Sequence, residues 1–263
     1  MSAARWAVLL ATGLVSAVGS ALVLAPASYA DLALDRASLG RIRLADTSGT
    51  LWNGSGRVVI TDGNAGDRLA GSQGLTLSGM AVPSRIGWSL RAVPLMIGIV
   101  DASLTIDPAR PAVRVSGTPT ELRVGAGGFS LPSADLARLG SPWNTIKPVA
   151  ALSMRWDALT LRQGVLDGRA SIELRDAASA MSPVRPLGSY RIEINGNGRE
   201  IFLTLSTLSG SLRLQGTGSW DRRAGVRFDA QAQAQGAQQA ALQSLLSLVG
   251  RRAGDKTIIK IGG

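Results

Sequence analysis

The side chains that most often carry out protein chemistry are absent from this sequence. Its 263 residues include no histidine and no cysteine. A Ser-His-Asp triad, an imidazole general base and a thiolate nucleophile are therefore excluded. A zinc site with cysteine or histidine ligands is excluded for the same reason. Disulfides cannot form, so cysteine pairing gives no information about the redox compartment.

The carboxylates and lysines of the sequence do not provide a catalytic site in place of the missing histidine and cysteine. Glu173 and Asp176 are close in sequence, but strand alternation directs Glu173 to a polar face and Asp176 lies at a strand end. An acid–base pair needs two carboxylates that converge on one site. The enzymatic alternative is a hydrolase built from Ser, Lys and Asp alone, but Lys147, Lys256 and Lys260 lack a Ser-x-x-Lys spacing. We therefore predict no enzyme activity and no catalytic, cofactor-binding or metal-ligating residues.

Three glycine-rich stretches are better explained by structure than by chemistry. Residues 54–56, 125–128 and 196–198 do not continue into the Gly-Lys-Ser/Thr of a phosphate loop. We interpret all three as turns or bulges. Residues 53–55 also fit a glycosylation acceptor, but we interpret them as an Asn-Gly turn.

The charge is strongly basic, with 28 Lys and Arg residues against 18 Asp and Glu residues and a net charge of +10. Such a balance is typical of proteins that bind nucleic acid, anionic membranes or acidic partners. Here the arginines are spread along alternating segments, as at Arg155, Arg169 and Arg191, which favours a solvated sheet face. A nucleic-acid module would show a concentrated patch with stacking aromatics. We predict no nucleic-acid partner, while arginine pairing with carboxylates of a protein partner stays open.

The amino terminus carries a long apolar stretch. Residues 6–25 contain no charged side chain, and 20 helical residues span ~30 Å, the thickness of a bilayer core. Arg5 and the free amine favour a cytoplasmic amino terminus, and Pro26 would end the helix. We predict a transmembrane anchor over residues 1–30 and a domain outside the cytoplasm over residues 31–263. A cleaved signal peptide ending at residue 30 and a buried helix are the alternatives.

The exported part is predicted to form an antiparallel β-sheet. Polar and apolar side chains alternate along residues 166–175, which is the pattern of a half-buried strand. Asn-Gly pairs in residues 195–198 predict a tight hairpin turn, and glycines near 63, 164 and 225 mark further turns. Since no long helical crossovers separate the strands, we expect an all-β meander or sandwich. Strand candidates besides these are 41–46, 50–61, 74–79, 85–91, 98–106, 111–116, 120–125, 153–162, 190–194, 201–205, 212–214 and 226–230.

Two helices interrupt the strands. Residues 133–139 follow Pro132 and precede a glycine, which predicts a short helix. Residues 236–250 form the stronger prediction, a short amphipathic helix with leucines at 242, 245 and 246 on one face. Residues 257–261 could be a last strand. Residues 141–150, with two prolines, are the candidate for an internal boundary or long loop.

Four tryptophans lie in or at the end of predicted strands. Trp52, Trp88, Trp156 and Trp220 could fill the core or anchor an interface, because tryptophan is frequent at binding hot spots. The last three are each followed by a glycine and an aspartate in a similar order, which suggests a weak internal repeat of hairpins. Any two hairpins with glycine turns look alike, so both interpretations stay open.

Several strings occur in the order of a known family. They are Ser-Gly-Thr-Leu-Trp-Asn-Gly at 48–54, Ile-Gly-Trp-Ser-Leu-Arg at 86–91, the Leu-x-Gly-rich run at 208–216 and the leucine-rich helix at 242–249. In this order, after a short anchor, they resemble type II secretion system protein N over nearly the whole chain. The link at 251–256 is unusually basic for the family.

The resemblance implies a function without catalysis. A member would be a single-pass inner-membrane protein of a Gram-negative cell, with a β-rich periplasmic domain and a cytoplasmic amino terminus. It would serve in the export of folded proteins across the outer membrane. Its partners would be other inner-membrane components of the type II system and the outer-membrane secretin, and it would bring no catalytic or metal residues.

The alternative function is lipid binding or transfer in a β-groove of the inner membrane. The two functions predict different sheets. An open curved sheet with an apolar face over an unfilled groove would favour lipid, and a closed sandwich would favour the scaffold. The side chains that decide between them are Leu166, Ile172, Leu174, Ile192 and Ile194.

Overall fold

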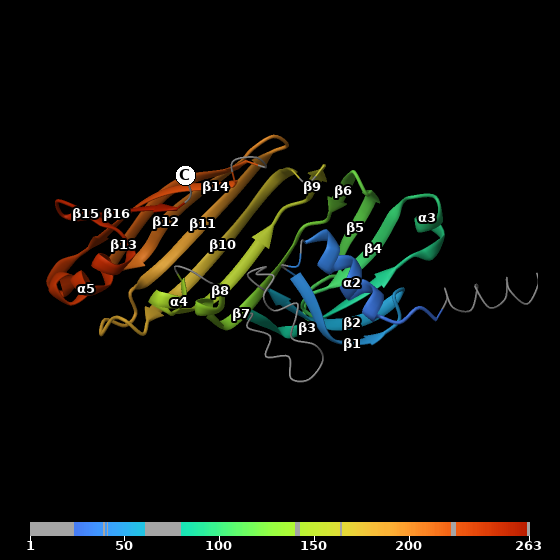
Figure 1. The fold of residues 1–263 in the computed structure, drawn as a ribbon, viewed down its shortest axis with the longest axis horizontal. Coiled ribbons are helices and arrows are strands. Elements are labelled where there is room, and N and C mark those ends of the chain that lie inside the picture. The colour runs from blue at the N-terminus through green and yellow to red at the C-terminus, as the bar shows by residue number, and fades with distance from the viewer. Residues whose placement is uncertain are drawn as a thin grey trace, which may run out of the picture.

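A computed structural model describes residues 24–38, 40, 42–60, 80–139, 143–163, 165–221 and 225–261. Within these residues, sixteen strands join in one antiparallel sheet (Figure 1). The first strands are β1 (Ile42–Gly49), β2 (Asn53–Ile60), β3 (Met80–Leu90), β4 (Val100–Thr105), β5 (Val113–Thr118), β6 (Glu121–Val124), β7 (Gly127–Asp135) and β8 (Pro148–Trp156). The later strands are β9 (Leu159–Arg162), β10 (Val165–Ser179), β11 (Gly188–Asn197), β12 (Ile201–Gly210), β13 (Leu212–Asp221), β14 (Gly225–Ala234), β15 (Arg251–Ala253) and β16 (Lys256–Ile261).

Short helices lie between and beside these strands. They are α2 (Ser28–Ala37), α3 (Ala92–Met96), α4 (Trp143–Ile146) and α5 (Gln239–Val249), with 3₁₀ turns η2 (Leu136–Leu139) and η3 (Gly236–Gln238). None of the helices in this described part is long and apolar enough to cross a membrane. Nearly all of the predicted anchor, residues 1–23, lies outside the described residues, as do the predicted turn at 62–63 and the strand at 74–79.

The sheet is a meander that divides at its longest strand. Neighbours in sequence pair with each other on most of the path, as the alternating pattern and glycine turns predict. β10 is 15 residues long, and two partners share one of its edges. β9 pairs with its first residues, 165–167, while β8 pairs with residues 170–179. The strands β6 and β7 continue this division, because β6 pairs with β9 and β7 pairs with β8.

One face of the central sheet is apolar. Residues directly opposite each other in a ladder point to the same face, so the register places Met154, Ile172, Ile192 and Leu205 in one row across β8, β10, β11 and β12. The neighbouring positions on the other face are polar or charged, as at Glu173. This is the alternation expected of a sheet with one half-buried face, and it confirms the all-β prediction.

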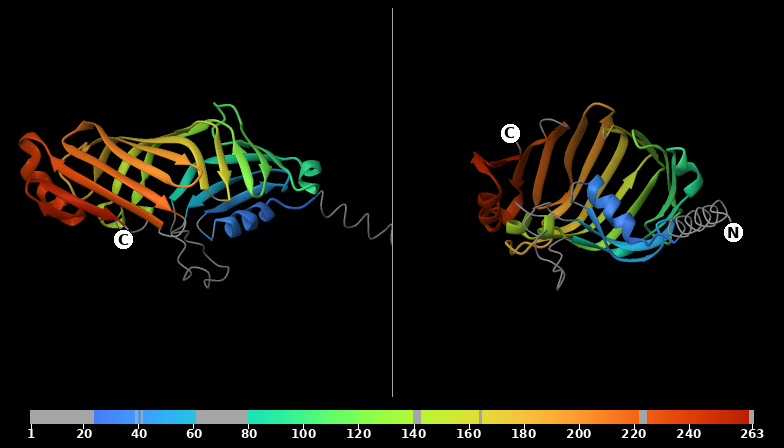
Figure 2. Two further views of the ribbon diagram at one scale, coloured as in Figure 1. Left: turned by 90° about the horizontal axis from the view of Figure 1, so that it is seen from above. Right: turned by 45° about the vertical axis from the view of Figure 1, so that its right-hand side comes forward.

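The sheet curls so that the apolar face lies inside. Val58 of β2 packs against a buried cluster formed by Leu131, Ala134 and Leu136. β2 and β7 are not neighbours in the sheet, so only a curled sheet brings them together. Figure 2 shows this curvature from two further sides. The sequence predicts a meander or a sandwich, and the observed sheet is a meander.

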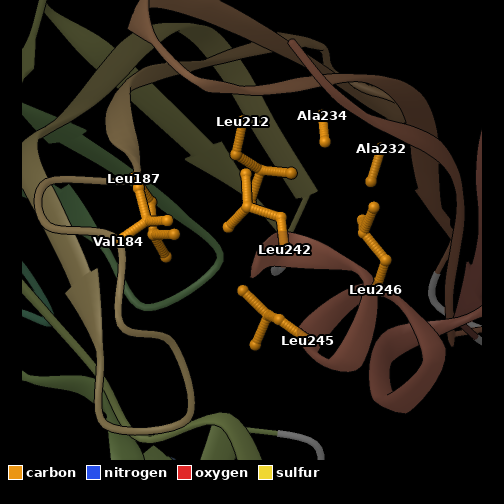
Figure 3. Close-up of a cluster of buried hydrophobic side chains, with 8 residues drawn as sticks. All are labelled: Val184, Leu187, Leu212, Ala232, Ala234, Leu242, Leu245 and Leu246. Atoms are coloured by element: carbon orange, nitrogen blue, oxygen red, sulfur yellow. The ribbon is translucent and has the colours of Figure 1, made fainter. Parts of the chain in front are cut away.

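The far end of the sheet is covered by α5, as the leucine spacing predicts. Leu242 and Leu245 are the most deeply buried of its side chains. Figure 3 shows how they point toward the sheet and toward the segment before β11. The full cluster contains Val184, Leu187, Leu212, Ala232, Ala234, Leu242, Leu245 and Leu246. The predicted last strand is confirmed as β16.

The first strand is covered on its outer edge by α2, which was not predicted. The backbone N–H of Leu44 donates to the Asp31 carboxylate at 2.7 Å, and the N–H of Ile42 donates to the Ser38 hydroxyl at 2.9 Å. Arg43 adds an ion pair to Asp31 at 2.9 Å. These contacts satisfy outward-facing donors of β1 that no neighbouring strand reaches.

Several local predictions were wrong in detail. The single strand predicted at 153–162 is two strands, β8 and β9, and the loop predicted at 141–150 contains α4 and the start of β8. The helix predicted at 133–139 is a 3₁₀ turn only from Leu136, because the first residues remain in β7 after a bulge. Pro132 lies at that bulge, where no ladder hydrogen bond is required of it. The predicted hairpin at 195–198 exists, but its turn comes two residues later, at Gly198 and Arg199. Gly198 has a φ of 78°, which suits glycine at the first loop position.

Candidate functional site

Glu173, the first of the carboxylates considered for catalysis, is ion-paired with two arginines instead. Glu173 accepts hydrogen bonds from Arg175 at 2.9 Å and from Arg191 at 2.8 Å. These two guanidinium groups, Arg175 first, hold the pKa of Glu173 below its usual value. Within the described residues, no group of three potential metal ligands comes together. The candidate functional sites considered next are therefore binding surfaces.

The first such surface lies where the chain emerges from the predicted anchor. The Ala25 carbonyl accepts a hydrogen bond from the N–H of Leu51 at 2.8 Å, and the Ala27 N–H donates to the Gly49 carbonyl at 3.2 Å. Pro26 lies opposite Thr50 in an isolated bridge. The turn between β1 and β2 thus holds the residues that directly follow the apolar segment.

A tryptophan braces this turn from the next strand. Trp88 lies opposite Gly54, and its indole N–H donates to the Leu51 carbonyl at 3.0 Å. A Cβ at Gly54 would be only 2.6 Å from the Trp88 ring, so a side chain there would collide with it. Residues 48–54 therefore form a compact turn that packs against the ring of Trp88. We call this turn the socket.

The same arrangement occurs a second time. Trp156 lies opposite Gly127, its indole N–H donates to the Gly125 carbonyl at 2.9 Å, and a Cβ at Gly127 would be 2.6 Å from its ring. Trp220 faces Ile201 and Val226 instead. The glycines in these two pairs precede the tryptophans and are not those of the predicted repeat, which stays a prediction; both rings are half-buried between strands.

Directly beyond the socket lies an apolar loop. The Trp52 carbonyl accepts from the N–H of Leu90 at 2.7 Å. Leu90 ends β3, and α3 follows at once. The loop closes where the Arg91 N–H donates to the Asp101 carbonyl at 2.9 Å, and none of the α3 residues is buried. Sequence reasoning missed α3, although its run of apolar residues does not alternate and is broken by a proline.

The base of this loop is positively charged. Arg114 and Arg91 both pair with the Asp101 carboxylate, at 3.2 and 2.9 Å. The hydrogen bond from Arg114 is the largest of the interactions that lower the pKa of Asp101 below its usual value. Two guanidinium groups on one carboxylate leave a net charge of +1 beside the apolar residues.

The second surface is the apolar face of the curled sheet. Leu166, Ile172, Leu174, Ile192 and Ile194 are all half-buried, and no second sheet packs on them among the described residues. Ile172 lies directly opposite Ile192, and Ile194 opposite Ala170. The described residues thus form one curved sheet and no closed sandwich, while Leu174 packs against the buried clusters that contain Leu131 and Tyr190.

Comparison with known proteins gives one match. Residues 40–258 match the family described as Type II secretion system (T2SS), protein N. This range begins before β1 and ends within β16, so it includes the socket, α3 and the apolar sheet face. No curated protein and no solved structure matches the chain.

Proposed function

We propose that this chain, which belongs to the type II secretion system protein N family, acts as a non-catalytic scaffold anchored in the inner membrane. Residues 6–25 span the membrane with the amino terminus in the cytoplasm, and the sheet lies in the periplasm. Its partners are other inner-membrane components of the type II system and the outer-membrane secretin. The family match carries the assignment to secretion.

The way the chain joins the sheet supports an anchored scaffold. Ala25, the last residue of the apolar segment, is itself hydrogen-bonded to Leu51. No flexible linker therefore separates the segment from the β1–β2 turn. An anchor joined in this way fixes the orientation of the sheet toward the membrane, which a positioning protein requires.

A secretion assay tests the proposal. The gene is deleted in a strain that depends on its type II system, and each exported enzyme is measured in the medium and in the periplasm. We expect the enzymes to accumulate in the periplasm and to return to the medium when the full chain is supplied. Replacement of Leu14 and Leu22 by Arg should abolish this rescue, because it charges the anchor. Unchanged secretion in the deletion strain would contradict the scaffold role.

A second candidate function is lipid binding on the apolar face. The observation that favours it is the row of half-buried Ile172, Ile192 and Leu205, which faces the inside of the curl. Acyl chains bind to such surfaces because burial removes apolar area from water.

Photo-crosslinking can separate this function from the scaffold role alone. A photoreactive residue is placed at Ile192, or at its neighbour Glu193 on the opposite face, in the full chain in native membranes. A phospholipid adduct at Ile192 and none at Glu193 would support lipid binding on the apolar face. The absence of an adduct at Ile192 would contradict it and leave the scaffold proposal untouched.

A further inference from the structure

The most exposed large hydrophobic side chains gather at one end of the molecule. Within the described residues, the four highest exposed fractions are those of Met96 at 85%, Val93 at 77%, Ile97 at 75% and Leu24 at 69%. The first three belong to α3 and the residue after it, and the fourth lies one residue before Ala25. Large apolar side chains exposed together mark a contact surface for a partner or a membrane.

Hydrogen bonds explain why these two sets are neighbours. Ala25 is hydrogen-bonded to Leu51, and the next residue, Trp52, is hydrogen-bonded to Leu90, two residues before the start of α3. Figure 2 shows the same relation, since α3 and the first described residues lie at one end of the sheet. The exposed loop is therefore held beside the point where the predicted anchor leaves the membrane.

The fold itself gives no reason for an apolar α3. The helix buries none of its side chains. The sheet makes other reversals with very short polar loops, as at Gly198 and Arg199. The loop is nevertheless firmly shaped, because Ile97 and Gly98 donate backbone hydrogen bonds to Pro94 and Leu95 at 3.1 and 3.0 Å. It presents its apolar side chains outward in a fixed geometry.

We propose that the loop at residues 93–97 inserts its side chains into the headgroup region of the bilayer leaflet from which the sheet emerges. The proposal rests on the membrane anchor of the proposed function. A short apolar loop beside basic residues fits an interface that is apolar below and anionic above. Arg91 and Arg114 at the base supply the positive charge. The bilayer is favoured over a protein partner because the anchor brings it to this end.

The absence of cysteine makes the proposal directly testable. Met96→Cys introduces the single thiol of the full chain, which is labelled with an environment-sensitive fluorophore in liposomes that contain anionic lipid. Lipids with a nitroxide near the headgroup then serve as quenchers. We expect a blue shift of the emission and a loss of intensity at this position. The control is Leu248→Cys on α5, which is also exposed, at 51%, but lies at the opposite end of the sheet.

A third position separates the loop from the anchor. Leu14→Cys reports whether residues 6–25 are in the bilayer; because Leu14 lies near the middle of this segment, its quencher is a lipid with a nitroxide deep in the acyl chain. Quenching at positions 14 and 96 but not at 248 supports the loop contact. Quenching at 14 alone refutes the loop contact and keeps the anchor. No quenching at either position refutes both, and quenching at 248 equal to that at 96 refutes a contact made by the loop in particular.

A charge substitution gives an independent check. Val93→Asp in the Met96→Cys chain should remove most of the quenching at position 96, because a carboxylate does not enter the interface readily. Val93 is exposed, so the sheet should keep its stability. The matched control is Leu208→Asp on β12, another exposed apolar residue. Equal quenching at position 96 in all three chains would overturn the proposal.

Discussion

Gly54 should tolerate even a methyl group poorly. A Cβ at this position would lie 2.6 Å from the Trp88 ring, 2.8 Å from the Thr50 carbonyl oxygen and 2.9 Å from the Ser48 carbonyl oxygen. Two of these neighbours are backbone atoms of the same tight turn. The third is held in place by its hydrogen bond to Leu51. None can withdraw without breaking a contact.

The expected cost of Gly54→Ala follows from these contacts. Overpacking of a well-packed site costs about 1–3 kcal/mol, and loss of the indole hydrogen bond costs about 1 kcal/mol more. We therefore expect a destabilisation of about 2–4 kcal/mol. The matched control is Gly87→Ala on the adjoining strand, where the nearest atom to a new Cβ is 3.7 Å away, an ordinary contact. The control should change stability by less than about 1 kcal/mol.

Denaturant unfolding of the full chain in detergent, followed by the β-sheet circular dichroism signal, measures the difference. Tryptophan emission gives a second readout, because displacement of Trp88 exposes its ring to water. If Gly54→Ala unfolds at the same denaturant concentration as Gly87→Ala, the socket is not rigid. The anchor would then not be rigidly joined to the sheet.

Further outcomes follow from other parts of the sheet. Leu242→Ala should destabilise by about 2–5 kcal/mol because its side chain is fully buried between α5 and the sheet, whereas Leu248→Ala should be nearly neutral in the same unfolding assay. Tyr190→Phe removes a buried hydroxyl that donates to a backbone carbonyl of β13 at 3.0 Å, and should cost about 1 kcal/mol by the same measurement. Burial raises the pKa of Asp31, but hydrogen bonds from Arg43 and a backbone N–H outweigh it, so the pKa lies below the ordinary 3.8. A depressed pKa stabilises the fold above the unfolded value, so this contribution should be lost as the pH falls below about 3.8. Asp31→Asn should flatten that part of the pH profile, and an unchanged acid response would contradict the assignment.

The strands could be predicted because their cause is local. A sheet with one buried face imposes a period of two on the sequence, and residues 166–175 carry that period without interruption. The α5 leucines carry the helical period in the same way. In both cases the period of the apolar residues shows which side of the strand or helix packs against the core.

The turn and bulge positions could not be fixed in this way. Two Asn-Gly pairs follow each other at 195–198, but the pairing of β11 with β12 places the two loop positions at Gly198 and Arg199. Pro132 is compatible with a helix start or with a bulge, and the choice depends on how β7 pairs with β8. Such choices are made by partners distant in sequence.

The candidate surfaces were only partly visible in the sequence. The tryptophan at 88 and the glycine at 54 were both noticed, but their contact depends on the register of β2 against β3. The exposure of Val93, Met96 and Ile97 was hidden, because an apolar run resembles a buried segment until the strands around it are placed. The half-buried apolar face was predicted from alternation, whereas its inward curl depends on the contact of Val58 with β7.

The cover that α2 places over β1 prevents a further strand from pairing with the covered part of this edge of the sheet. Fibrous stacking by edge pairing needs two complementary free edges, one to donate a strand and one to receive it. Asp31 and Ser38 already occupy outward donors of the first strand. The other terminal strand, β15, has three exposed residues, two of them arginine. A strand from another protein can therefore add beside β15 but not beside the part of β1 whose outward donors are already occupied.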